Sequence, residues 1–148
     1  MTIPEPRIAV LQDVDTKPGA GAFWDETHAR IHLRLGCIGA VTNGAVRELP
    51  AIRATGFHLF AGSLSAAEGY AHIIDIGRPV EVANLVIHPG DLIHGDLHGV
   101  VHIPKEVGAQ VPETAGRIIG IRRQVADLCS SSLEFSLERL MALLKDLE

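Results

Sequence analysis

The alternation of apolar strand patterns with helical patterns in the first sixty residues constrains the fold most. Strand patterns at residues 7–12, 38–42 and 57–61 are separated by helical patterns at residues 23–35 and 48–55. Alternation of this kind favours parallel strands joined by right-handed crossovers. The first part of the chain is therefore predicted to be an α/β unit built on a parallel sheet.

The pattern changes beyond residue 70, where short strand patterns follow one another without helices between them. Such spacing is typical of antiparallel hairpins, and the pair Ala83-Asn84 is the tightest predicted turn because Asn tolerates a positive φ. The strands expected here are residues 70–76, 79–82, 85–87, 91–94 and 100–103.

The chain after Pro104 is predicted to be helical, as the C-terminal tail (about 105–148) of a single domain spanning residues 1–148. Ser136 is a plausible N-cap for the last helix. An apolar stripe on that helix needs a partner, either the core of the domain or a neighbouring subunit. The stripe consists of Leu137, Leu140, Met141 and Leu144.

Composition excludes several classes of protein. Of the 148 residues, 47% are apolar, which argues against disorder, and no apolar run is long enough to span a membrane. The formal charge of −5 argues against a nucleic-acid groove. The start, MTIPEPRIAVLQD, lacks the layout of a signal peptide, so a cytoplasmic location is expected, with Cys37 and Cys129 reduced.

The stretch GAVTNGAVRELPAIRATGF places a cation and a carboxylate directly after a strand pattern. Asn43-Gly44 is expected to end that strand, so Arg47 and Glu48 should lie at the carboxyl edge of the sheet, where ligands of α/β folds bind. The helix expected from Phe23 presents free N–H groups at the same edge, with Glu26 in its first turn.

This edge favours the binding of an anion and of a hard divalent cation. A guanidinium holds carboxylate or carbonyl oxygens, and paired carboxylates suit Mg²⁺ with water completing its shell. The alternative is that Glu26 only favours the helix start while Arg47 and Glu48 form a solvated surface pair. Composition and spacing alone favour this alternative.

A resemblance to a known family changes that balance. The segment GAFWDETHARIHLRLGCIGAVTNGAVRELPAI, followed by PVEV and PGDLIHGDLHGVVHIP, resembles the RraA-like family over residues 7–104. That family includes divalent-metal 4-hydroxy-4-methyl-2-oxoglutarate aldolases and regulators of ribonuclease E. Its aldolase signature is an acidic residue, a gap of twenty residues, and then Arg-Asp. Here twenty residues separate Glu26 from Arg47, and Glu48 follows.

The resemblance implies roles for individual residues. Arg47 would bind the 2-oxo acid and stabilise its enolate, Glu48 would be the direct metal ligand, and Glu26 would hold metal-bound water. Arg47 and Glu26 are the implied catalytic residues. Backbone N–H groups around the helix start would hold the substrate carboxylate. The implied substrate-binding residues are Asp25, Glu26, Thr27, His28 and Arg47.

The resemblance also implies a swivelling β/α/β domain that assembles as a homotrimer or higher homo-oligomer, with a small 2-oxo acid as substrate and Mg²⁺ or Mn²⁺ as cofactor. It implies further that the helix-and-strand segment usual before the strand at Arg7 is absent. Two positions depart from the family pattern: Glu48 stands where the aldolases have Asp, and Asp25 stands where the family usually has Gly.

The implied reaction is a retro-aldol cleavage or a decarboxylation, both of which leave a pyruvate-type enolate. A metal ion and Arg47 would stabilise its oxyanion. The main alternative is a non-catalytic regulatory protein on the same fold. A Schiff-base mechanism is disfavoured because only Lys17 lies near this edge. Many relatives carry the label demethylmenaquinone methyltransferase-like, but the chain has no glycine-rich loop for S-adenosylmethionine.

Two further features have ordinary structural explanations. A histidine-rich stretch is interrupted by Pro89-Gly90 and Gly95, so its residues are expected in turns and strands rather than in a zinc site. The alternative metal site would use His88, Asp91, His94, Asp96, His98 and His102. The sole tryptophan, Trp24, is expected to pack a helix onto the sheet, and shielding of a pocket is the alternative.

Overall fold

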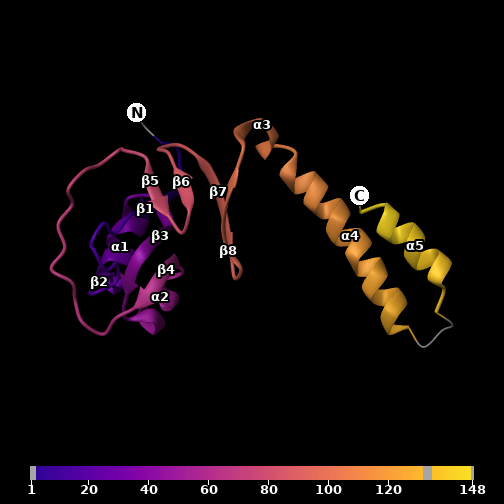
Figure 1. The fold of residues 1–148 in the computed structure, drawn as a ribbon, viewed down its shortest axis with the longest axis horizontal. Helices are drawn as coiled ribbons and strands as arrows, with labels where there is room; N and C mark the ends of the chain where they lie inside the picture. Colours follow the sequence, from indigo (N-terminus) through magenta and orange to yellow (C-terminus); the bar gives the residue numbers. More distant parts are fainter. Residues whose placement is uncertain (1–2, 132–134, 148) are drawn as a thin grey trace. The chain divides into compact units, whose positions relative to one another are not determined.

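The protein divides into two compact units in a computed structural model that describes residues 3–131 and 135–147. The first unit extends to Ile103 and contains every strand of the described residues, and the second begins at Pro104 and is helical where it is described (Figure 1). The α/β class is confirmed, as are the predicted hairpins and the helical C-terminal tail. The prediction that the whole chain forms one domain stays a prediction.

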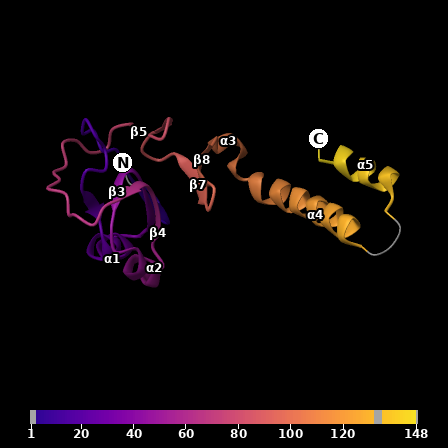
Figure 2. The ribbon, with the colours of Figure 1, turned by 60° about the horizontal axis from the view of Figure 1, so that its bottom comes forward.

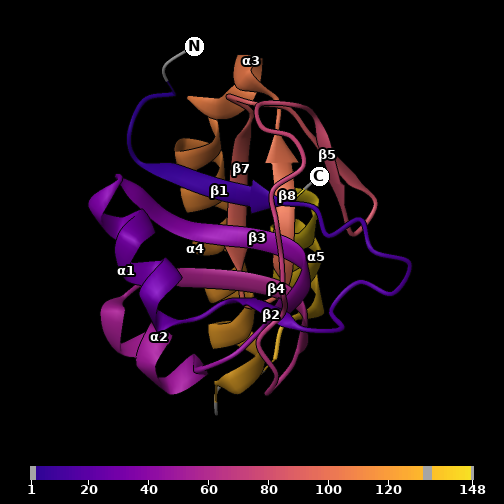
Figure 3. The ribbon, with the colours of Figure 1, turned by 90° about the vertical axis from the view of Figure 1, so that its left-hand side faces the viewer.

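The sheet of the first unit is built around one long central strand, β3 (Cys37–Val46). β4 (His58–Leu64) pairs along one edge of β3. β1 (Arg7–Leu11) and β2 (Ala22–Trp24) share the other edge, because β1 pairs with the first half of β3 and β2 with its end. Figure 3 shows β1, β3 and β4 side by side. All these pairs are parallel, which confirms the predicted topology.

The prediction that the central strand stops at Asn43-Gly44 is wrong, because β3 continues to Val46. Leu11 pairs with Thr42, and Ala22 pairs with Ala45, so Asn43 and Gly44 lie where β1 gives way to β2. The Asn43 side chain accepts from Asp13 N–H at 2.6 Å and donates to Asp13 C=O at 2.8 Å. Asn43 therefore fixes the loop at residues 12–21 instead of ending the strand.

α1 (Glu26–Arg34) begins later than predicted. Phe23 and Trp24 belong to β2, where backbone pairing with β3 takes precedence over their position in a helical pattern. On this helix Ala29 is fully buried and Leu33 packs against the core, whereas Ile31 is 50% exposed. The helix ends before Gly36, which has the positive φ expected of a terminating glycine.

α2 (Leu49–Thr55) follows β3 after only two residues. Pro50 lies in its first turn, where the missing N–H costs nothing. Glu48 precedes the helix with φ 57° and ψ 35°, a left-handed conformation that L-residues adopt at some cost. α1 and α2 contribute to one core with β2 and β3, whose buried members are Trp24, Ala29, Ala40, Val46, Ile52 and Phe57.

Two hairpins complete the first unit: β5 (Val80–Val82) with β6 (Leu85–Ile87), and β7 (Leu92–Asp96) with β8 (Gly99–Ile103). Ala83 and Asn84 both have positive φ, which confirms the predicted tight turn. A Cβ on Gly95 would lie 2.5 Å from the Phe60 ring. Successive side chains of a strand point to opposite faces of the sheet. Leu59 of β4 packs against the core on the side of the helices, so Phe60 and the second hairpin lie on the other face of the sheet.

The strand predicted at residues 70–76 is wrong, since this segment is irregular. Its apolar side chains are exposed, including Tyr70, Ile73, Ile74 and Ile76. β-branched composition produced the prediction, but the segment has no neighbouring strand to pair with among the described residues.

The second unit consists of α3 (Lys105–Gly108), α4 (Val111–Ser130) and α5 (Leu137–Lys145) (Figure 2). Arg117 donates to the Asp146 carbonyl at 2.7 Å, which joins α4 to the end of α5. Ser136 accepts from Arg139 N–H, so the predicted N-cap is confirmed. Leu137, Met141 and Leu144 of the predicted stripe are exposed. Among the described residues, no helix combines the length and apolarity needed to cross a bilayer.

Candidate functional site

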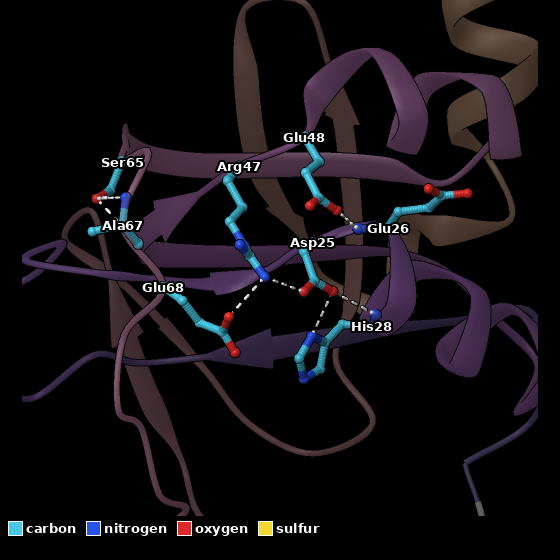
Figure 4. A network of polar contacts seen from close by, with 8 residues as sticks. All are labelled: Asp25, Glu26, His28, Arg47, Glu48, Ser65, Ala67 and Glu68. Carbon is cyan, nitrogen blue, oxygen red and sulfur yellow. Dashed lines mark hydrogen bonds and ion pairs between the residues drawn. The ribbon is translucent and has the colours of Figure 1, made fainter.

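The start of α1 is organised by Asp25, a buried carboxylate that lies between β2 and the helix. Its Oδ1 accepts from the His28 backbone N–H at 3.0 Å and lies 2.8 Å from His28 Nδ1. A β-region residue with a carboxylate at this position is a typical N-cap. The local sequence WDETH therefore ends a strand, caps a helix and fixes an imidazole within five residues (Figure 4).

Arg47 meets this carboxylate from the end of β3. Its backbone N–H donates to Trp24 C=O at 3.0 Å, so β2 and β3 hold Asp25 and Arg47 next to each other. Arg47 Nη2 donates to Asp25 Oδ2 at 2.9 Å and to Glu68 Oε2 at 3.0 Å. Arg47 Nε is buried and has no acceptor within the described part of the chain. The guanidinium thus retains an unmet donor although two carboxylates already contact it.

The charges of this network stabilise one another. Burial by itself raises the pKa of Asp25, but the hydrogen bonds from His28 and Arg47 outweigh it and lower the pKa to about 2. The bond to Asp25 raises the pKa of Arg47, against the effect of desolvation, and Glu68 and Glu48 raise it further. Asp25 is therefore ionised and Arg47 charged at neutral pH.

The Glu48 carboxylate contacts the main chain of Glu26 rather than the Glu26 carboxylate. Glu48 Oε2 accepts from the Glu26 backbone N–H at 3.2 Å. The Glu26 carboxylate turns away and pairs with Arg30 Nη2 at 2.7 Å, one helical turn further along α1. Of the two predicted metal ligands, only Glu48 extends toward the network around Arg47 (Figure 4).

The predicted anion site at the start of α1 is occupied by the chain's own carboxylates. Asp25 bonds the His28 N–H, and Glu48 bonds the Glu26 N–H. Thr27, the remaining predicted contact, lies exposed in the first turn. A substrate carboxylate would therefore have to exchange with Glu48 or bind at Arg47.

Sequence reasoning missed Glu68, which lies outside any strand or helix. The backbone around it pairs with Ala22, whose N–H donates to Ala67 C=O at 2.8 Å and whose C=O accepts from Gly69 N–H at 2.9 Å. A Cβ on Gly21 would lie 2.5 Å from Gly69 Cα, so glycines permit this approach. Those two glycines were the only available signal, and neither indicates which residue contacts Arg47.

The residues around Arg47 fit a hard divalent cation by their charge and donor chemistry. Asp25, Glu48 and Glu68 bring three negative charges to one guanidinium, and the Glu26–Arg30 pair is neutral. The excess of two negative charges equals the charge of Mg²⁺ or Mn²⁺, whose preferred ligands are carboxylate oxygens. Across residues 3–131 and 135–147, no three His, Cys, Asp or Glu side chains converge as a complete ligand set, so water would supply most of the shell.

The histidine-rich stretch forms turns and strands, as expected, with His94 in β7 and His102 in β8. Asp91 accepts from His88 N–H, and Asp96 accepts from His98 N–H, both at 2.8 Å. Asp91 also lies 3.7 Å from His102 Nε2. The predicted packing role of Trp24 is likewise confirmed, because its buried ring, in β2, contacts the His32 ring of α1 with centroids 4.6 Å apart.

Comparison with known proteins identifies the family. Residues 2–102 match the profile of the RraA-like family, described as Aldolase/RraA. The match covers more than half of the 148 residues, and the chain belongs to this family.

Curated relatives match only in part of their own length. Protein DlpA of Legionella pneumophila is 29% identical over 101 residues, 67% of this chain and 16% of the relative. A candidate 4-hydroxy-4-methyl-2-oxoglutarate aldolase of Halalkalibacterium halodurans is 42% identical over 72 residues, 48% of this chain and 34% of that protein. An uncharacterised protein of Methanocaldococcus jannaschii is 32% identical over 93 residues, 62% and 45% of the two chains. The chain therefore spans less than half the length of each of these relatives.

Solved structures support the fold. An uncharacterised protein from Pseudomonas syringae pv. tomato superposes with a TM-score of 0.76 at 20% identity, over 95% of this chain and 65% of that chain. RraAS2 of Streptomyces coelicolor, described as an unusual member of the RNase ES inhibitor RraA protein family, superposes with a TM-score of 0.59 at 22% identity. The latter match covers 73% of this chain and 55% of that chain. At these identities the likeness establishes the fold alone.

Proposed function

We propose that this chain carries the site of a divalent-metal-dependent lyase that cleaves a carbon–carbon bond in a small 2-oxo acid. The reaction class is a retro-aldol cleavage or a decarboxylation. Both reactions place negative charge on the oxygen of a pyruvate-type enolate. The family, and the resemblance to a candidate aldolase, support this class of reaction.

The observation that carries the proposal is the incomplete hydrogen bonding of Arg47. A buried donor without an acceptor costs about 1–3 kcal/mol, so native structures rarely retain one without a reason. Arg7 Nε, Trp24 Nε1 and Arg47 Nε are such donors among the described residues, and of the three only Arg47 is paired with the carboxylates of Asp25 and Glu68. An oxygen of a bound 2-oxo acid would satisfy Arg47 Nε and would gain a charge-assisted bond as its negative charge develops.

Each neighbouring residue has a defined part in this proposal. Asp25 holds one end of the guanidinium and keeps it charged, while His28 holds Asp25. Glu48 is the residue that would hold the cation, and its left-handed backbone directs its carboxylate toward the start of α1. Glu26 would hold metal-bound water only after its carboxylate had left Arg30. When bound, Mg²⁺ or Mn²⁺ supplies a Lewis acid that polarises the substrate carbonyl.

The test is pyruvate release from 4-hydroxy-4-methyl-2-oxoglutarate or oxaloacetate, with Mg²⁺ and with excess EDTA. Arg47→Ala is expected to lower the rate at least about 100-fold, because removal of one oxyanion donor typically costs that much. Arg53→Ala, in the exposed last turn of α2, is the matched control and should retain the rate. Circular dichroism checks that both variants fold. EDTA-insensitive turnover, or activity that survives Arg47→Ala, would refute the proposal.

A second function is favoured by one specific observation. Asp25 and Glu48 already bind the amides that a substrate carboxylate would need. A chain that fills its own anion site is consistent with a non-catalytic regulatory protein, and one structural neighbour is described as an unusual member of the RNase ES inhibitor RraA protein family. The same assay separates the two functions, since a regulator would give no metal-dependent turnover above background.

A further inference from the structure

Arg47 contacts two carboxylates whose surroundings differ sharply. Asp25 is 10% exposed in its side chain and receives two bonds from His28, so it is fixed. Glu68 is 70% exposed in its side chain and contacts only Arg47 through its carboxylate among the described residues. A ligand from solvent therefore meets Glu68 before it meets Asp25.

The backbone that carries Glu68 is held more firmly than its side chain. Ala67 and Gly69 pair with Ala22, and the Ser65 hydroxyl bonds the Ala67 N–H and C=O, each at 3.2 Å. The carboxylate is thus kept at high local concentration beside Arg47 while its side chain can rotate away. This arrangement makes Glu68 a tethered competitor for the guanidinium.

We infer that Glu68 is an internal carboxylate that occupies the solvent side of Arg47 and sets the affinity of the site for small 2-oxo acids and related dicarboxylates. The inference rests on the proposed function, because it takes Arg47 as the group that binds the substrate. A ligand must displace Glu68 to complete its bonds to Arg47. Its apparent affinity is reduced by the fraction of molecules in which Glu68 is bound.

The size of the effect follows from the exposure of the pair. Exposed ion pairs have small interaction energies that salt screens further. Removing the Glu68 charge should therefore raise the affinity for a competing dianion about two- to fivefold at low ionic strength. The gain should shrink as salt is added, because the competition is electrostatic.

The experiment measures oxalate binding to the full chain by calorimetry at a fixed, saturating Mg²⁺ concentration. Wild type is compared with Glu68→Gln, which keeps the shape of the side chain and removes its charge. The matched control is Glu5→Gln, since Glu5 and Arg7 form a second exposed Glu–Arg pair, at 2.6 Å and with a side-chain exposure of 66% for Glu5. Glu68→Gln is expected to bind oxalate about two- to fivefold more tightly, and Glu5→Gln is expected to match wild type.

Two further measurements separate this inference from the proposed function. The Arg47 Nε–H signal in ¹H–¹⁵N spectra should shift when oxalate is added to wild type, and Arg47→Ala should abolish binding. If both hold but Glu68→Gln binds oxalate no more tightly than wild type, the inference is wrong and the proposed site survives. If oxalate binds equally well without Arg47, the proposed site itself is wrong. A change in Mg²⁺ affinity alone, with unchanged oxalate affinity, would also overturn the inference.

Discussion

Asp25 connects three features of the site that the chain supplies from different places. It caps α1, orients the His28 ring and holds the Arg47 guanidinium at 2.9 Å. A buried carboxylate with this many donors is strongly stabilised in its ionised form. The stability of the first unit should therefore depend on the charge of this one side chain.

The pKa of Asp25 falls from its usual 3.8 to about 2 in the folded protein, so its contribution to stability depends on pH in a defined direction. A depressed pKa stabilises the folded state above pH 3.8, and this contribution disappears as the pH falls toward 2. Asp25→Asn keeps the capping ability but removes the charge. We expect the variant to unfold about 1–2 kcal/mol more easily at neutral pH, with the difference vanishing near pH 2.

Urea unfolding of wild type and Asp25→Asn at pH 7, 4, 3 and 2 measures this difference. Asp75→Asn, on the exposed ion pair with Arg78, serves as the control and should show almost no effect at any pH. A difference for Asp25→Asn that stayed constant from pH 7 to 2 would show that the charge of Asp25 is not the cause.

The residues of the site differ in how far the sequence could predict them. The twenty-residue gap between Glu26 and Arg47 places both at one end of α1, as the structure shows. The orientation of the Glu26 carboxylate could not be predicted, because Arg30 lies on the same helical face and competes for it. Glu68 could not be predicted either, because its contact depends on backbone pairing between two segments without a periodic pattern.

At the scale of elements, β3 determines the position of the site. Arg47 and Glu48 follow directly after its last residue. The edge of β3 opposite β4 pairs first with β1 and then with β2. The sequence predicted the strand but ended it four residues early, because Asn-Gly is usually a turn signal. Here Asn43 uses its amide for the backbone of Asp13, so a residue that favours turns stabilises a strand junction.

Asn43→Ala tests this junction. The variant removes the bonds to Asp13 N–H and C=O at 2.6 and 2.8 Å, and we expect a loss of about 1–2 kcal/mol in the free energy of unfolding. The loop at residues 12–21 should open locally. Hydrogen exchange at the amides of Asp13 and Gly19 should accelerate through local opening. Exchange at Ala29 in α1 should accelerate only by the amount that the lower free energy of global unfolding accounts for. Equal acceleration at all three amides would contradict a local role for Asn43.

At the scale of the whole molecule, the two units differ in how completely they bury apolar side chains. The first unit has a continuous core from β2, β3 and two helices. The second has one buried residue among its described residues, Ile121, and exposes Leu137 and Met141 at 63% and 60%. The homotrimer or higher homo-oligomer predicted from the family resemblance would give this apolar surface a partner, as would packing of the tail within a single domain.

Met141→Glu distinguishes these two partners. Light scattering of the wild-type chain should give the mass of three or more chains, and the charged substitution should lower that mass if α5 contacts other chains. If the stripe instead packs within its own chain, the mass should stay constant and the melting temperature should fall. Glu138→Gln, on the same helix, is the control. A wild-type mass of one chain would refute the predicted homotrimer.

The loop at residues 12–21 leaves the edge of β3 at Leu11 and rejoins the same edge at Ala22. Both attachment points are fixed by strand pairing, and the stretch from Val14 to Pro18 is exposed. Residues inserted after Thr16 would lengthen the exposed part of this loop without moving Trp24 or Asp25. This loop is therefore a suitable position for an epitope or a fluorescent label, and natural variation in its length would leave the chemistry beside it intact.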